Sequence, residues 1–381
     1  MKRRLLWTIA LAFAVTLVGC AVTLAQTDER PAAGPPQGPV TVTYFYDALS
    51  ADGQWFQDPT NGWCWTPYDV AADWRPYNDG NWEYTDYGWS WASNESFGWA
   101  TYHYGRWFLD DSYGWAWAPG TEWAPAWVAW RSSDQWVGWA PLPPAARWDD
   151  SSGLAFADAG SIPSEEWSFV PRDHMLDASL SLQVTSVGRN VTLLAGSEDA
   201  TRFEDRGGRP ADVGIEVSLV EKGIGRAVPR QRIVDADAPA RGDGRPSGAG
   251  NVAFFRPAIR APAAGQAPEP VMREHTSPIP DADMERVRAE QQGKLETGLA
   301  SEHTRLLRDQ ESELRTQQPG PASDAIRQRH VAEQQAFDAH ATRQRQVLGR
   351  RMQKQIVRPA KGNEGGRQDN RNGGDKDAGN H

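Results

Sequence analysis

The polar residues with the best spacing for chemistry surround His103. This histidine lies between Tyr102 and Tyr104 in the sequence. Arg106 and Glu122 complete the best polar cluster that the chain offers. General acid–base catalysis, which most often uses histidine and carboxyl side chains, would be the chemistry of such a cluster. We favour a hydrogen-bonded structural histidine, because no catalytic motif accompanies it.

The sequence motifs of the common enzyme and metal-site classes are missing. There is no HExxH or CxxC motif, no His-rich ligand spacing and no GxSxG nucleophile elbow. Cys64 has no obvious histidine partner, so we expect a buried free thiol. Glu165 and Glu166 would face opposite ways in a strand, whereas paired acid–base work needs carboxylates that converge. We therefore expect no enzymatic activity, no metal and no cofactor.

Tryptophan is the residue type best suited to hold a ligand. The chain has 19 tryptophans, and 17 of them lie between Trp55 and Trp148. We favour the interpretation that they form the core of a small sheet, and the alternative is an exposed platform on which sugar rings stack. Residues 41–148 hold 13 acids and 4 bases, which suits neutral sugars better than anionic polymers. The candidate ligand-facing residues are Trp89, Trp91, Trp99, Tyr102, His103, Tyr104, Trp107, Trp115 and Trp117.

A repeat with a period of 26 residues must position these tryptophans. The string GWxW begins at Gly62, Gly88 and Gly114, and a GxW string precedes each copy by eight or nine residues. The two tryptophans of each GWxW are i, i+2 neighbours, which point to one face of a strand. Turn-rich strings between GxW and GWxW favour hairpins. The repeat predicts a compact antiparallel β-meander of three copies over residues 41–148, after which the pattern loosens.

Several strings within this region resemble a family of uncharacterised, exported, Trp-rich bacterial proteins. They are FYDAL, WRPY, YHYGRW, WAPAW and GWAPLPP, in addition to the repeated GWxW. The resemblance covers about residues 44–148, with a weaker echo at Ile224–Val234. It implies an envelope or secreted location and no known enzyme role, and it supplies no catalytic residue. Cys64 departs from it, since a less reactive residue is expected there.

The N-terminus, residues 1–25, has the pattern of an export signal. A basic start is followed by the apolar stretch Leu5–Val18 and by Cys20. Leu17–Cys20 resembles a bacterial lipobox, which would make Cys20 the site of lipid attachment. Ordinary cleavage before Gln26 and an uncleaved membrane anchor remain alternatives. Residues 26–40 are expected to be a Pro-rich tether.

The region after the repeat is predicted to be a small extension, an α/β or β unit over residues 149–235. Within it, the alternating stretch Ser179–Val187 and the following Val191–Leu194 predict a β-hairpin. Ile215–Val220 is ambiguous, because it alternates like a strand but leads into glycines that suit the end of a helix. Residues 236–280 are rich in Pro, Ala, Gly and Arg and are expected to be a linker.

The C-terminal part, residues 281–357, predicts a helical hairpin broken only at residues 319–321. Its second helix carries an 11-residue recurrence of Ile326, Phe337 and Leu348, with His330, Ala341 and Met352 four residues behind. The first helix has 9 acids and 6 bases and the second has 3 acids and 7 bases, which favours antiparallel pairing. This stripe suggests binding to a partner protein or self-association. Residues 358–381 are expected to be disordered.

The composition limits the function. The net charge of −10 argues against nucleic-acid binding, which needs a basic footprint. We expect an α+β chain, mainly β at its N-terminal side, that touches a membrane only through an N-terminal lipid or anchor. It would lie in the periplasm or at the outer membrane of a Gram-negative-like bacterium, or be secreted. The favoured function is a non-enzymatic envelope scaffold with a protein partner at the helices, and the alternative is a carbohydrate- or peptidoglycan-binding module.

Overall fold

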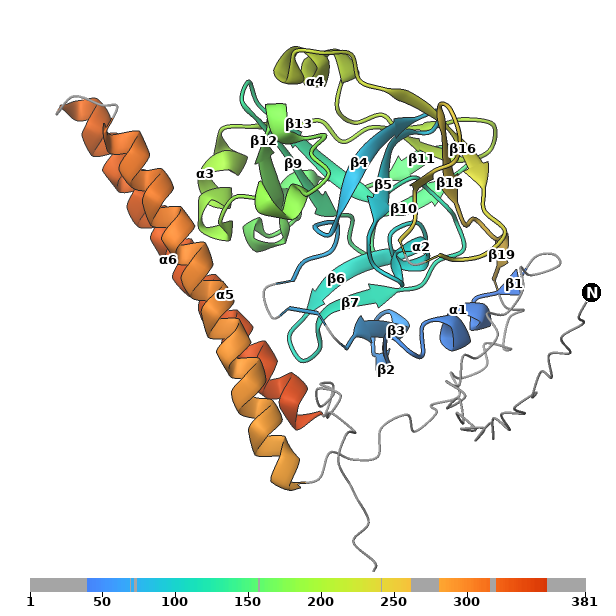
Figure 1. The fold of residues 1–381 in the computed structure, drawn as a ribbon, viewed down its shortest axis with the longest axis horizontal. Coiled ribbons are helices and arrows are strands. Elements are labelled where there is room, and N and C mark those ends of the chain that lie inside the picture. Colours follow the sequence, from blue (N-terminus) through green and yellow to red (C-terminus); the bar gives the residue numbers. More distant parts are fainter. Residues whose placement is uncertain are drawn as a thin grey trace, which may run out of the picture. The chain divides into compact units, whose positions relative to one another are not determined.

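The computed structural model describes residues 40–68, 70–71, 74–156, 158–240, 242–261, 281–315 and 320–354 (Figure 1). The export signal with Cys20, most of the tether and the C-terminal tail lie outside these ranges. The described chain is mainly β-strand over residues 40–260 and ends in two long helices, α5 (Asp281–Arg315) and α6 (Pro321–Gln353). The predicted fold class is therefore confirmed. Within the described ranges, no helix is long and apolar enough to cross a membrane.

Each sequence repeat forms one β-hairpin. The hairpins are β2–β3 (Gly53–Asp58, Gly62–Pro67), β4–β5 (Gly80–Thr85, Gly88–Ser93), β6–β7 (Arg106–Asp110, Gly114–Ala118) and β8–β9 (Val128–Ser132, Trp136–Pro141). One tryptophan pair faces across each hairpin: Trp55 with Trp65, Trp82 with Trp91, Trp107 with Trp117, and Trp130 with Trp139. The architecture thus continues into a fourth hairpin, beyond the three copies that the GWxW string marks.

The two repeated motifs fit together for a steric reason. A side chain at Gly53 would lie 2.3 Å from the indole of Trp65, and one at Gly80 would lie 2.7 Å from that of Trp91. The glycine of GxW therefore leaves room for the second tryptophan of GWxW on the opposite strand. This contact explains why the two strings recur together.

The hairpins do not line up in chain order. The first and third join in the sheet β2-β3-β7-β6, the second lies inside the sheet β14-β15-β5-β4-β16-β18-β17, and the fourth lies inside β12-β9-β8-β13. The added strands are β12 (Ser168–Pro171), β13 (Glu198–Asp199), β14 (Phe203–Asp205), β15 (Pro210–Asp212), β16 (Arg230–Asp235), β17 (Arg245–Pro246) and β18 (Asn251–Phe254). The antiparallel hairpins could be predicted from the sequence. The order of the strands could not, because it pairs residues that are far apart in the chain.

The remaining elements are short. They are β1 (Val40–Thr41) paired with β19 (Ile259–Arg260), β10 (Arg147–Asp149) paired with β11 (Gly153–Ala155), α1 (Thr43–Ala48), α2 (Gly98–Thr101), α3 (Asn190–Ala195) and α4 (Val217–Ile224). Five 3₁₀ turns complete the described chain: η1 (Ala159–Ser161), η2 (Ser164–Glu166), η3 (Arg172–His174), η4 (Leu180–Leu182) and η5 (Val187–Arg189).

The core of the β-rich part is aromatic. Of the 18 tryptophans in the described ranges, 14 are buried and four are half-buried. Neighbouring rings meet edge to face, as where the ring centroids of Trp82 and Trp91 lie 5.0 Å apart. Buried indoles also donate to backbone oxygens, for example Trp89 to Ile215 at 2.8 Å. Tryptophan thus supplies the apolar area that aliphatic residues supply in most cores.

The predicted β-hairpin over residues 179–194 is wrong. The chain there forms η4 and η5 and then α3. Leu180 and Val184 are buried, whereas Leu182 between them is 75% exposed, so the alternating pattern does not match the buried face. The two buried residues are four positions apart, which fits the helical turn η4 and not a strand. The ambiguous stretch after Ile215 forms α4, which ends at Gly225 in the left-handed conformation with a φ of 70°.

The predicted linker is also wrong where the structure describes it. Residues 242–261 contain β17, β18 and β19, and Val252, Phe254 and Phe255 are buried in the main core. The β-rich part therefore extends to residue 260, beyond the predicted extension that ends at residue 235. The sequence did not predict these short strands within a Pro- and Gly-rich stretch, because their pairing partners, such as β16, come from elsewhere in the chain. The rest of the predicted linker, residues 262–280, lies outside the described ranges.

The helical hairpin is confirmed, and its helices are antiparallel. Arg345 in the second half of α6 bonds Glu296 near the middle of α5 at 2.7 and 2.8 Å, whereas Gln310 near the end of α5 donates to Glu333 in the first half of α6 at 2.8 Å. Phe337, Ala341 and Met352 of the 11-residue stripe are buried. Ile326 and Leu348 of the same stripe are half-buried. The recurrence therefore marks the inner face of the hairpin, as its period predicts.

Candidate functional site

His103 is a buried structural residue that joins distant segments. Its Nδ1 lies 2.9 Å from the Ala124 carbonyl oxygen, and its Nε2 lies 3.3 Å from Asp243 Oδ2. Its ring stacks on Trp123. Both polar partners of the ring nitrogens are thus protein groups in the core. Asp243, which belongs to the supposed linker, could not be recognised as the partner from sequence spacing.

The rest of the predicted polar cluster does not assemble around His103. Arg106 and Glu122 are close enough to influence each other's pKa. The guanidinium carbon of Arg106, however, lies 3.5 Å from the ring centroid of Trp127, and its Nε donates to the Ala146 carbonyl at 3.1 Å. Burial lowers the pKa of Arg106 to about 9. The Arg106 side chain therefore stacks on Trp127 and bonds the Ala146 carbonyl, and neither contact involves the His103 ring.

The nine candidate ligand-facing residues are all buried. Trp89, Trp91, Trp99, Tyr102, His103, Tyr104, Trp107, Trp115 and Trp117 are between 0% and 6% exposed. Because the sheets pack through the faces that carry the tryptophan pairs, these rings contact one another and not solvent. The prediction that these residues form an exposed stacking platform is therefore wrong, because they belong to the aromatic core.

Cys64 lies in a small apolar cluster with Phe56, Ala116 and Ala118. Burial, together with the nearby charges of Asp58 and Asp110, raises the pKa of its thiol to about 12. A thiolate is thus disfavoured at neutral pH, which removes the reactive form of the side chain.

We therefore predict that Cys64 is unreactive in the folded protein. In a Cys20→Ser background, Ellman's reagent at pH 8 should label almost no thiol before unfolding and about one thiol per chain in guanidinium chloride. The readout is absorbance at 412 nm. Rapid stoichiometric labelling of the folded protein would contradict both the burial and the raised pKa of this thiol.

Two carboxyl groups, the half-buried Glu95 and the buried Asp212, accept hydrogen bonds from tryptophan side chains. Glu95 accepts a hydrogen bond from Trp74 Nε1 at 2.6 Å and another from the Tyr102 hydroxyl. Asp212 accepts from Trp130 Nε1 at 2.8 Å and from the Gly214 amide at 3.1 Å. Burial raises the pKa of each to about 8. Perturbed carboxyls often mark active sites, but Asp212 is fully buried and Glu95 is half-buried, and each already has its own protein donors.

Glu165 and Glu166 lie in η2 and make different contacts. Glu165 Oε1 lies 3.1 Å from Arg343 Nε of α6, so it contacts the helical hairpin. The pKa of Glu166 is raised to about 7 by burial and by its neighbour Glu165. Among the residues that the structure describes, no cluster of His, Cys, Asp and Glu could hold a metal ion.

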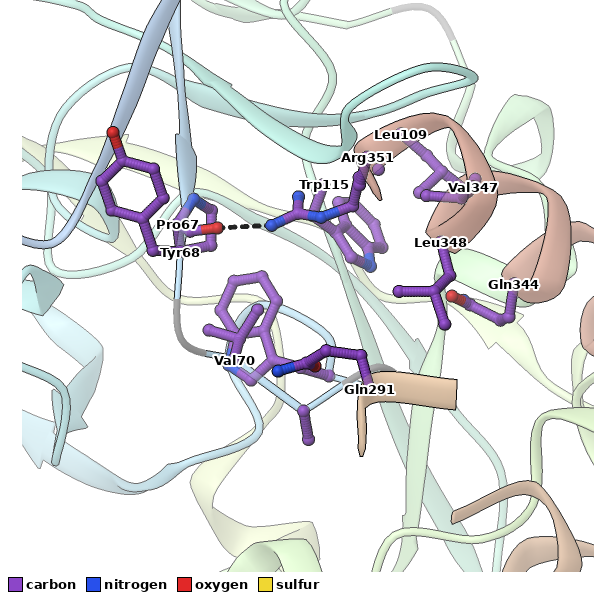
Figure 2. Close-up of a pocket in the computed structure, with 13 residues that line it drawn as sticks. Pro67, Tyr68, Val70, Leu109, Trp115, Gln291, Gln344, Val347, Leu348 and Arg351 are labelled. Atoms are coloured by element: carbon purple, nitrogen blue, oxygen red, sulfur yellow. Dashed lines mark hydrogen bonds between the residues drawn. The ribbon is translucent and has the colours of Figure 1, made fainter. Parts of the chain in front are cut away.

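The functional site that the geometry supports is the seam between the helical hairpin and the β-rich part (Figure 2). Here Trp115 of β7, Pro67 of β3 and Val347 of α6 surround a cavity of about 50 Å³. A space of this size holds water-sized molecules and no larger ligand. The seam is therefore a packed contact and not an open substrate pocket.

Arg351 anchors one end of this seam. Its Nη1 donates to Thr66 Oγ1 at 2.8 Å and also to the Tyr113 carbonyl, and its Nη2 donates to the Pro67 carbonyl at 2.7 Å (Figure 2). Burial lowers the pKa of Arg351 to about 10. Charge-assisted bonds to oxygens from two different hairpins give this contact a defined geometry.

Glu302 anchors the seam further along α5. It is buried, and its Oε1 accepts from the Val187 amide at 2.6 Å and from Ser186 Oγ at 3.2 Å. Arg189 adds ion pairs to Glu313 at 2.6 Å and to Asp309 at 3.3 Å. The sequence singled out neither Glu302 nor Arg351, although polar residues interrupting the helical stripe were a signal that such contacts exist. This arrangement can hold two parts of a protein in register.

Comparison with known proteins gives one family match. A model described as a family of unknown function (DUF6600) matches residues 46–146, the stretch from α1 to the end of the fourth hairpin. Neither the curated proteins nor the solved structures give a significant match. The β-hairpin region is thus similar to an uncharacterised family, and the similarity brings no active-site residue with it.

Proposed function

We propose that this chain is an exported cell-envelope protein without enzymatic activity, in which the β-rich part presents the helical hairpin to a protein partner. The observation that carries the proposal is the pair of polar anchors, the buried Glu302 and the half-buried Arg351, which fix the hairpin on the β-rich part. The match to a family of unknown function is compatible with such a role and does not specify it.

The anchors support presentation because they specify one position of the hairpin. Hydrogen bonds from buried charged groups are lost if the helices slide, and each buried partner left without a bond costs about 1–3 kcal/mol. Glu165, which contacts Arg343, lies between the two anchors along the seam. A hairpin held only by apolar contacts would tolerate several registers.

The outward faces of the helices are available to a partner. Helix α5 has 35 residues and is therefore about 50 Å long. Leu307 and Val331, which are 44% and 58% exposed, lie among polar side chains on these faces. Long, mostly polar helical surfaces of this kind suit a reversible protein contact better than a permanent one.

The anchors can be tested by an Arg351→Met substitution. The change keeps most of the apolar stem but removes the donors to Thr66, Tyr113 and Pro67, so the end of α6 should detach. Hydrogen exchange followed by mass spectrometry should be at least about tenfold faster over residues 340–353 and unchanged in β4 and β5. Arg345→Met is the matched control, because it removes only the exposed pair with Glu296, which is worth about 0–1 kcal/mol. Equal exchange in the two variants would contradict anchoring by Arg351.

The proposed function is tested in cells that express the full chain. After fractionation into envelope and cytosol, a photo-crosslinking residue at Gln335, exposed on α6, should give one discrete adduct with another envelope protein. The same residue at Lys222, exposed on α4, should give none. The adduct should weaken in the Arg351→Met background if presentation requires docking. A cytosolic chain, or no adduct from any exposed position of the hairpin, would overturn the proposal.

Saccharide binding is a second candidate function, but fewer tryptophans are available for it than the sequence suggested. Among the described tryptophans only Trp63, Trp74, Trp136 and Trp148 are not fully buried. Trp74 is bonded to Glu95 and faces the small cavity of the seam, and Trp148 is bonded to Asp150. Trp136 lines a larger hollow, and this observation favours the second candidate.

A further inference from the structure

We infer that the groove beside Trp136 is a binding site for a neutral saccharide, an inference that gives the second candidate function its site. The groove has a volume of about 650 Å³, within the range of 300–1,000 Å³ typical of ligand sites. Its walls come from the β8–β9 turn, from the region of η5 and α3, and from both helices of the hairpin. Sites for small ligands commonly occur where separate parts of a fold meet in this way.

Trp136 is held in a fixed orientation in this groove. It begins β9, where it pairs with Pro171 of β12, and its backbone amide donates to Ser133 Oγ at 3.2 Å. The guanidinium of Arg189 lies 5.3 Å from its ring centroid, and Asp309 and Glu313 hold that guanidinium in turn. An aromatic ring fixed before binding loses little entropy when a ligand stacks on it.

The indole of Trp136 still has binding capacity. Within the described part of the chain, its N–H has no hydrogen-bond acceptor, and it is not among the buried polar atoms that lack partners. The half-buried ring packs in part on the core cluster that contains Trp167 and in part beside Arg189, and its remaining surface offers an apolar contact and a donor that reaches solvent. A pyranose ring has the complementary arrangement, with C–H groups on its face and hydroxyl oxygens at its edge.

The charges of the groove favour a neutral ligand. Three carboxyl groups, from Asp134, Asp309 and Glu313, and two guanidinium groups, from Arg189 and Arg329, line it. Both arginines are paired, since Arg329 also contacts Glu313 at 3.4 Å. With no unpaired positive charge in the lining, an anionic polymer would meet net repulsion.

The uncharged polar side chains of the groove suit sugar hydroxyl groups. Ser133, Gln135, Thr192 and Ser312 line it, which provides both donors and acceptors from three segments of the chain. Hydroxyl-rich ligands need several such partners, because each buried hydroxyl without one loses affinity. Together with Trp136 they form a polar rim around one aromatic surface.

The test is calorimetric titration of the full chain with cellohexaose and hexa-N-acetylchitohexaose, both neutral, and with polygalacturonate, which is anionic. A neutral oligosaccharide should bind, and Trp136→Ala should weaken that binding at least about tenfold, while Trp136→Phe should retain part of it. Trp148→Ala is the matched control, because it removes a half-buried tryptophan outside the groove and should bind like the unmodified chain. Near-UV circular dichroism checks that each variant is folded.

The alternative results are distinct. If neither neutral oligosaccharide binds, both the second candidate function and this site are wrong. If one binds equally well to folded Trp136→Ala or Trp136→Phe and to the unmodified chain, saccharide binding stands but this groove is not its site. If only polygalacturonate binds, the neutral class of ligand is wrong. These outcomes do not depend on whether the hairpin has a protein partner. The inference needs only that the hairpin packs on the β-rich part.

Discussion

Replacing Trp117 by alanine is expected to lower the free energy of unfolding by about 3–5 kcal/mol, enough to unfold a marginally stable chain. Trp117 is completely buried, faces Trp107 across its hairpin and faces Trp65 across the junction of the first and third hairpins. Its Nε1 also donates to the Tyr104 carbonyl at 2.6 Å. The substitution leaves a large cavity at the point where two hairpins meet, together with a buried carbonyl that loses its donor.

The measurement is urea unfolding followed by far-UV circular dichroism. Trp148→Ala is the control, because this half-buried residue bonds only to the exposed Asp150 and should cost about 1 kcal/mol or less. Trp117→Phe should fall between the two, since it keeps an aromatic ring but loses the bond to Tyr104. Similar losses for Trp117→Ala and Trp148→Ala would mean that the aromatic cluster is not the stabilising core.

The stability of the protein is expected to fall as the pH rises from about 4 to about 8. The main cause is two carboxyl groups, the half-buried Glu95 and the buried Asp212, whose pKa is raised to about 8 in the folded chain. Their pKa in an unfolded chain is about 4. Between these values the folded state keeps protons that the unfolded state releases, so the stabilisation present below pH 4 is lost as the pH approaches 8. The loss should be on the order of a few kcal/mol for each group.

Asp212→Asn should flatten this pH dependence. The amide cannot ionise, and its oxygen can still accept from Trp130 Nε1 and the Gly214 amide. Glu95→Gln should remove a further part of the slope, because its amide does not ionise and can still bond Trp74 and Tyr102. Melting temperatures between pH 4 and pH 8 provide the measurement. Asp173→Asn, at an exposed position, should leave the slope unchanged, and a wild-type stability that rises over this interval would contradict the burial of the two acids.

Local features of the fold could be predicted because their causes are local. The GxW and GWxW strings set the hairpins through turn chemistry and through the space that Gly53 or Gly80 leaves for an indole. The antiparallel pairing of α5 and α6 follows from an 11-residue stripe and from opposite charge on the two helices. Each of these patterns involves residues within one or two neighbouring elements.

The functional residues were less predictable than the fold. His103 was recognised as a buried polar residue, but its partner Asp243 lies 140 positions away in a stretch with the composition of a linker. Arg351 and Glu302 looked like ordinary polar residues of a helix, and only the docked hairpin brings them to Pro67 and Val187. Trp136 differed in no sequence feature from its buried neighbours.

By itself, the sequence determined the secondary structure of the repeats and of the helices, and the aromatic character of the core. Only the tertiary structure decided which hairpins share a sheet, which short segments after residue 148 complete the sheets, and which of the tryptophans still reach solvent. The physical reason is that a tryptophan has the same local preference for a strand whether its outer face meets protein or water. Burial depends on what packs from elsewhere in the chain, and those contacts leave no trace in the spacing of nearby residues.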